Sequence, residues 1–158
     1  MIYVIVTVFV LLIMVIILYN SLIRKKNDVE NSFATVDVML KKRYDLIPSI
    51  VETVKGYMIH ERNLLAEITS LRSQALSDNL TNDDRVIIEN KLFRGLSDLF
   101  VAVENYPELK ASQNFLNLQR SINEVEEQLA ASRRAFNAAV TVYNNSVEVF
   151  PSNIIASI

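Results

Sequence analysis

The segment MIYVIVTVFVLLIMVIILY, residues 1–19, decides the fold because it contains no Asp, Glu, Lys or Arg. As an α-helix it covers about 28 Å, close to the roughly 30 Å hydrocarbon core of a bilayer. Apolar side chains surround such a helix, which excludes an amphipathic helix and leaves a membrane span or a buried core helix. A cleaved signal peptide fits less well, since no basic residue precedes the run and no Ala-x-Ala-like site follows. We expect a transmembrane anchor at residues 1–20.

Three basic residues, Arg24, Lys25 and Lys26, follow the apolar run, and none precedes it. By the positive-inside rule, the amino terminus lies outside and the rest of the chain lies in the cytoplasm. The same charges either fix only this topology or also contact anionic lipid headgroups.

The composition predicts a helical chain, because two glycines and three prolines leave little material for hairpins or phosphate-binding loops. The absence of cysteine excludes disulfides and thiolate metal sites. Basic residues outnumber acidic ones before Tyr44 and are outnumbered after it. This distribution argues against nucleic acid as a partner, since phosphate binding requires a broad basic surface.

Apolar residues recur every three or four positions in four segments, about 22–44, 47–75, 83–105 and 115–150. We therefore predict an all-α fold in which the anchor precedes an antiparallel up-and-down four-helix bundle over residues 21–150. At Asp45–Pro48 the chain either reverses or only kinks, because proline is unfavourable inside a helix. The segment Ser77–Asp83 is the clearest loop.

A short apolar tail occupies residues 151–158. If the chain reverses at Asp45–Pro48, the fourth helix returns this tail to the bilayer surface. Because the tail is too apolar for an ordinary solvated end, we predict interfacial contact there. The residues concerned are Ile154, Ile155, Ala156 and Ile158.

The sequence contains little that favours catalysis, a metal or a cofactor. His60 is the only histidine, and His60–Glu61 lacks the second histidine of an HExxH zinc helix. No Gly-rich phosphate loop is present, and the Ser and Thr residues have no plausible histidine partner. We predict that the chain is not an enzyme and binds no cofactor.

Two groups of charged residues are candidate sites. Glu61 lies on an apolar stripe, and we expect it to form a buried ion pair with Arg133 or Arg134, where the stripe of the fourth helix is interrupted. The run Lys41-Lys42-Arg43 is either a patch for an anion or acidic partner or a solvated face near a helix end.

Self-association is expected to come from the part after the anchor. The anchor contains no Gly, Ala or Ser, so it lacks the small residues through which membrane helices approach closely. The predicted fourth helix is longer than the soluble part of the first, which leaves apolar surface for a partner. We therefore expect a homo-oligomer.

Short motifs spread in order over nearly the whole chain carry a family resemblance. They are Tyr19-Asn20, Asn27, Val29, Val36–Val38, Leu40–Arg43, Asp45–Pro48, Val51–Lys55, His60-Glu61, Glu104–Ala111, Phe115, Leu118-Gln119, Arg133–Asn137, Tyr143-Asn144 and Phe150–Asn153. With these motifs the chain resembles the LemA family of bacterial membrane proteins.

The resemblance implies an anchored four-helix bundle in a bacterial cell membrane. It also implies a family without a settled activity, in which some relatives are linked to building membrane compartments and others are known as surface antigens. Phe136 stands where relatives often have Tyr, and many relatives continue beyond Ile158 into an aromatic-rich tail.

Two functions follow from these observations. The first is a membrane scaffold, formed by self-association of the helical bundle, that organises or curves the bilayer. The alternative is an adaptor that recruits a cytoplasmic signalling or envelope protein through residues 41–43 or an acidic face of the fourth helix. Membrane lipids are partners in both, and the identity of a protein partner is not specified by the sequence.

Overall fold

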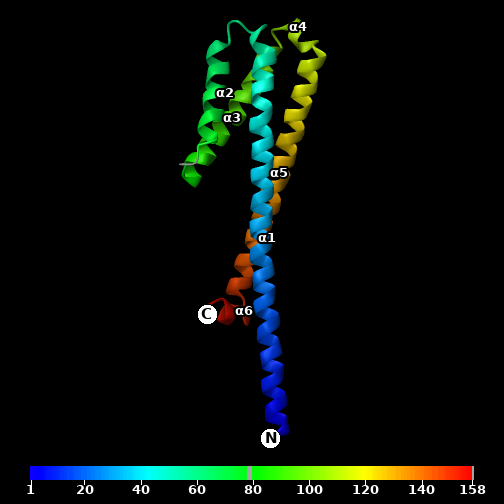
Figure 1. Ribbon diagram of the computed structural model, residues 1–158, viewed down its shortest axis with the longest axis vertical. Coiled ribbons are helices and arrows are strands. Elements are labelled where there is room, and N and C mark those ends of the chain that lie inside the picture. The colour runs from blue at the N-terminus through cyan, green and yellow to red at the C-terminus, as the bar shows by residue number, and fades with distance from the viewer. Residues whose placement is uncertain (78–79, 158) are drawn as a thin grey trace. The chain divides into compact units, whose positions relative to one another are not determined.

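The computed structural model describes residues 1–77 and 80–157, and these ranges are mainly helical and contain no strand. The predicted all-α fold, with a long apolar first helix followed by further helices, is confirmed (Figure 1). The helices are α1 (Ile2–Lys55), α2 (Arg62–Ala75), α3 (Asn82–Val103), α4 (Pro107–Lys110), α5 (Gln113–Glu148) and α6 (Ser152–Ala156).

By length and composition, α1 is the one helix of the described part that could cross a membrane, and none of its apolar window is buried. All side chains of residues 1–17 are exposed, and Leu18 is the first that is partly covered. Burial inside the chain, the alternative to a membrane span, is therefore not observed.

The chain divides into two compact units. Unit 1 contains Met1–Met39 and Gln128–Ile158, and unit 2 contains Leu40–Glu127. Parts of α1 and α5 belong to each unit, α6 belongs to unit 1, and α2, α3 and α4 belong to unit 2.

In unit 1, α5 runs antiparallel to α1. The side chain of Lys25 donates a hydrogen bond to Ser146, and the rings of Phe33 and Phe136 lie 5.6 Å apart. Leu18, Leu22 and Val29 of α1 are half-buried. They are separated by four and seven positions, as expected for one face of a helix.

In unit 2, five helical segments surround an apolar core, namely the end of α1, all of α2, α3 and α4, and the start of α5. Arg43 of α1 bonds to Glu126 of α5, and Asn114 of α5 donates to Thr53 of α1, so these two helices are again antiparallel. The fully buried apolar side chains of the unit come from every helix and from the turn after α1; they are Ile47, Ile50, Val54, Met58, Ile68, Leu92, Leu99, Leu109, Phe115 and Ile122.

The α2–α3 pair is close because Gly95 lies in the contact. A Cβ atom on Gly95 would be 3.1 Å from Cγ1 of Ile68, which is tighter than an ordinary van der Waals contact. Ile68 is completely buried. Gly95 therefore allows the two helices to bury Ile68 between them. This burial compensates the poor helix propensity of Gly95.

Of the two alternatives at Asp45–Pro48, reversal is not observed, because α1 continues through Pro48 to Lys55. Proline has no N–H, so the carbonyl of Tyr44, one turn earlier, loses its helical donor. In the structure Nε of Arg72 donates to this carbonyl at 2.7 Å. A side chain of α2 thus replaces the missing hydrogen bond, and the chain reverses later, at residues 56–61.

Because α1 does not end near Tyr44, two related expectations also change. The predicted helix 47–75 is the end of α1 plus α2. The part of α1 after residue 20 has 35 residues, nearly as many as the 36 of α5. The predicted loop Ser77–Asp83 includes residues 78–79, which lie outside the described residues. Near the end of this loop, Thr81 caps the N-terminus of α3, because its hydroxyl accepts a hydrogen bond from the Asp84 amide at 3.1 Å.

Arg72→Leu tests the role of Arg72 at Pro48. We expect it to lower the free energy of unfolding by about 1–3 kcal/mol, since it leaves the Tyr44 carbonyl without a donor. In a Pro48→Ala background the loss should be smaller, because residue 48 then supplies the helical N–H. The measurement is urea unfolding of the full chain in mild detergent, followed by circular dichroism.

The exposed Arg62 of the same helix provides the control, since Arg62→Leu should change stability little. If Arg72→Leu lowers the free energy of unfolding equally with and without Pro48, Arg72 does not replace the hydrogen bond that Pro48 removes.

Candidate functional site

The basic residues after the anchor differ in their surroundings. Arg24 and Lys26 are exposed, and Lys26 lies 3.8 Å from Glu30 in an exposed ion pair. Lys25 is half-buried and donates to the hydroxyl of Ser146 on α5. Two of the three charges are therefore available to solvent or headgroups, while the third joins the helices of unit 1.

The run Lys41-Lys42-Arg43 is not one surface patch. Lys41 and Lys42 are exposed, whereas only 1% of Arg43 is accessible to solvent. Arg43 lies one turn after Leu40 and one turn before Ile47, both buried, so it occupies the core face of α1. A partner patch at this position can contain Lys41 and Lys42 but not Arg43.

Arg43 forms the centre of a buried charge cluster in unit 2. Its guanidinium pairs with Glu89 of α3 and contacts Glu126 of α5 at 2.9 Å. The hydroxyl of Tyr44 donates to Glu89 as well. A buried arginine requires such partners, because an unpaired charge in an apolar interior is strongly unfavourable.

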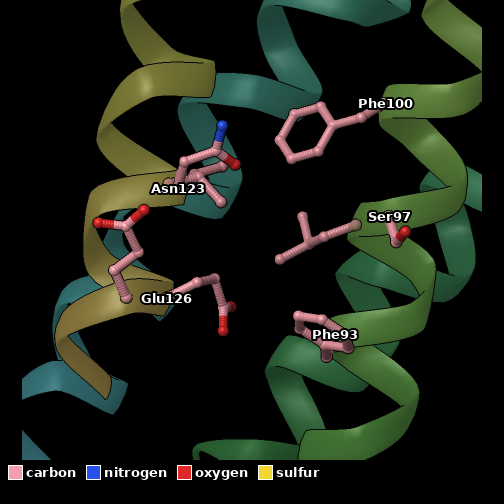
Figure 2. Close-up of a pocket in the computed structure, with 8 residues that line it drawn as sticks. Phe93, Ser97, Phe100, Asn123 and Glu126 are labelled. Atoms are coloured by element: carbon pink, nitrogen blue, oxygen red, sulfur yellow. The ribbon is translucent and has the colours of Figure 1, made fainter. Parts of the chain in front are cut away.

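Glu126 extends the cluster to the surface. Its side chain is 21% exposed and also lines a groove of about 340 Å³ between α3 and α5 (Figure 2). Phe93, Ser97 and Phe100 come from α3, whereas Asn123 and Glu126 come from α5. The groove thus combines aromatic surface with an amide and a carboxylate, and the carboxylate is held by Arg43.

The groove and the cluster have no arrangement typical of catalysis. His60, the only histidine of the chain, is exposed in the turn between α1 and α2. Within residues 1–77 and 80–157, no group of three or more His, Cys, Asp or Glu side chains is placed to hold a metal ion.

Glu61 and the two arginines proposed as its partners lie in different units. Glu61 is half-buried before α2 and accepts a hydrogen bond from the Tyr106 hydroxyl at 2.9 Å. Arg133 and Arg134 are exposed residues of α5 in unit 1. The expected burial is not observed at either arginine, and an ion pair with Glu61 stays a prediction.

Sequence reasoning missed Glu89 and Arg72. Glu89 lies three residues before the buried Leu92 and seven before the buried Leu96, so a carboxylate at a core position of α3 was the available signal. Arg72 gives no such signal, because its partner is a backbone carbonyl that becomes free only when α1 continues through Pro48.

The Tyr106–Glu61 contact predicts a dependence of stability on pH. The hydrogen bond to Glu61, followed by desolvation and the charge of Glu61, raises the pKa of Tyr106 above 10.0. The folded chain therefore retains this proton at a pH where the unfolded chain loses it, so stability falls as pH rises above about 10. The difference in unfolding free energy between the wild type and Tyr106→Phe should be constant from pH 7 to about 9 and shrink above pH 10. A difference that grows at high pH would contradict this contact.

Removing the charge of Arg43 tests the buried cluster. We expect Arg43→Met to lower the free energy of unfolding by about 3–5 kcal/mol, since it leaves the carboxylate of Glu89 buried without its cation. Lys42→Met at the neighbouring exposed position is the matched control and should change stability by less than about 0.5 kcal/mol. Urea unfolding of the full-length variants in mild detergent measures both, and equal effects would refute the assignment.

Comparison with known proteins identifies the family. The family model described as LemA family matches residues 32–158. Protein LemA of Metamycoplasma hominis is 26% identical over 137 residues, which cover 87% of this chain and 63% of that protein.

Two more distant relatives are Magnetosome protein MamQ 2 of Paramagnetospirillum magneticum and Magnetosome protein MamQ of Magnetospirillum gryphiswaldense. Each is 19% identical to this chain over an alignment 165 residues long. The alignment covers 89% of this chain and 61% of the relative. The chain thus spans less than two thirds of the length of these relatives. Because the family model matches most of the sequence, the chain belongs to the LemA family.

Proposed function

We propose that this membrane-associated helical protein is anchored by α1 and associates with further copies of itself into a scaffold that organises or curves the bilayer. The anchor is supported by the apolar side chains of residues 1–17, all of which are exposed. The names of the magnetosome relatives support a role at a membrane.

Unit 1 carries the argument for self-association. Within the described residues, its part beyond the anchor consists of the rest of α1, the end of α5 and the short α6, and two paired helices cannot enclose a core. Phe33, Val38 and Val142 are consequently 45%, 51% and 51% exposed. Apolar side chains left uncovered along a helix pair favour association with another helical surface.

In the proposed topology the chain after the anchor lies in the cytoplasm, and no reaction is assigned to the protein. The basic residues Arg24–Lys26 support this orientation. Digestion of right-side-out vesicles by added protease tests the orientation. The chain after the anchor should be protected, because it lies inside such vesicles. A non-enzymatic role is supported by the exposed position of His60, the only histidine of the sequence, in the turn between α1 and α2.

Val142→Glu tests the scaffold. In protein extracted mildly with its lipid, electron microscopy should show large or regular particles, and a version starting at Leu22 should lose them because it lacks the anchor. Val142→Glu should reduce particle mass at least severalfold, since a charge on the uncovered face opposes association. Its neighbour Thr141 is exposed and polar, so Thr141→Glu is the control and should preserve the particles.

Small, uniform particles in all samples would overturn the scaffold and favour the adaptor. Such an adaptor would use Lys41 and Lys42, so its capture of a cytoplasmic protein should be lost in Lys41→Glu/Lys42→Glu.

A further inference from the structure

A cluster of apolar side chains is exposed where α5 ends and α6 follows. Val149, Phe150 and Ile154 are 58%, 74% and 55% exposed, and we call them the C-terminal apolar cluster. The backbone turns sharply here, because the Asn153 amide donates to the Val149 carbonyl at 2.9 Å directly after α5. The three residues thus lie on one short turn of backbone, within six positions of the sequence.

The pairing of α1 with α5 fixes the level of this cluster in unit 1. Phe136 lies opposite Phe33, and Ser146 lies opposite Lys25. Continuing along α5 from Ser146 therefore moves toward the anchor end of α1. In Figure 1, α6, in red, is drawn at the level of the blue part of α1, and both belong to unit 1.

The burial of side chains along α1 supports the same position of the cluster. Leu18 is the only side chain in residues 1–20 that is half-buried, and the others are exposed. It lies at the end of the apolar run, seven residues before Lys25, which bonds to Ser146 of α5. The cluster consequently lies near the point at which α1 leaves the hydrocarbon core in the proposed topology.

Charge and hydropathy at this level match a lipid interface. Arg24 and Lys26 are exposed one to two turns after Asn20 and can face anionic headgroups. The apolar cluster beside them can insert at the headgroup–acyl boundary, as the apolar face of an interfacial helix does. Its proximity to the span favours a bilayer over a soluble partner as its occupant.

We propose that Val149, Phe150 and Ile154 form a second membrane contact, inserted into the interfacial region of the leaflet next to Arg24–Lys26. This inference rests on the proposed membrane span of α1. It also gives the predicted tail contact a structural basis that needs no reversal at Pro48, because the antiparallel course of α5 already returns the chain to the anchor end. Ile155 and Ala156 belong to the same tail, while Ile158, also predicted to contact lipid, lies outside the described residues.

The chain contains no tryptophan, so a single introduced tryptophan reports one site. We would place Phe150→Trp in the full chain, reconstituted in vesicles of phosphatidylcholine and phosphatidylglycerol with or without acyl chains brominated near the headgroup. Phe150→Trp should lose about half of its fluorescence in the brominated vesicles if it lies at the interface. Ile154→Trp should behave in the same way and guards against a local effect of one substitution.

Two further single-tryptophan variants separate the possible failures. Phe9→Trp lies in the proposed span and should be quenched by bromines placed deeper in the acyl chains. Val38 of unit 1 is 51% exposed and lies about 27 Å along α1 from Asn20, so the fluorescence of Val38→Trp should not be quenched.

Quenching of Phe9→Trp without quenching of Phe150→Trp and Ile154→Trp would overturn the second contact and leave the proposed anchor intact. If none of these three tryptophans is quenched, both proposals fail. A blue-shifted emission of Phe150→Trp without quenching would show that protein, such as a second copy, covers the cluster, and would also overturn the inference.

Discussion

The burial of Arg43 constrains unit 2 more than any other interaction. Its guanidinium must meet Glu89 of α3 and Glu126 of α5, and the next residue, Tyr44, receives Arg72 of α2 at its carbonyl. Two successive residues of α1 thus contact three other helices. A shift of one helical turn, about 5.4 Å, would separate the charges, so the cluster fixes the register that apolar packing alone leaves less specific.

Much of the fold could be predicted because it follows from local patterns. The uncharged run of residues 1–19 and the recurrent apolar positions predict the anchor and the helical class. The end of α1 could not be predicted, because the local cost of Pro48 is offset by Arg72, which is distant in sequence. Once α1 is extended, the contrast in helix length expected from the sequence disappears, and the case for association moves to the uncovered side chains of unit 1.

The charged residues show the same division between local and distant information. Arg43 was grouped with Lys41 and Lys42 by adjacency, but its place in the seam of Leu40 and Ile47 was a better guide to its environment. Glu89 could have been found by the same periodicity. The partner of Glu61 could not, because Tyr106 approaches it through the turn geometry after α3, which residue spacing within helices does not specify.

The pairing of α1 with α5 has a consequence for the order in which the protein is made. Lys25 meets Ser146 across a sequence separation of 121 residues, whereas α2 and α3 are neighbours along the chain. During synthesis the α2–α3 pair can form early, but the face of α1 that carries Val29 waits for nearly the whole chain. Until α5 emerges, that face is open to lipid, to chaperones and to other nascent chains, so this is the interval in which the protein is most prone to mispairing.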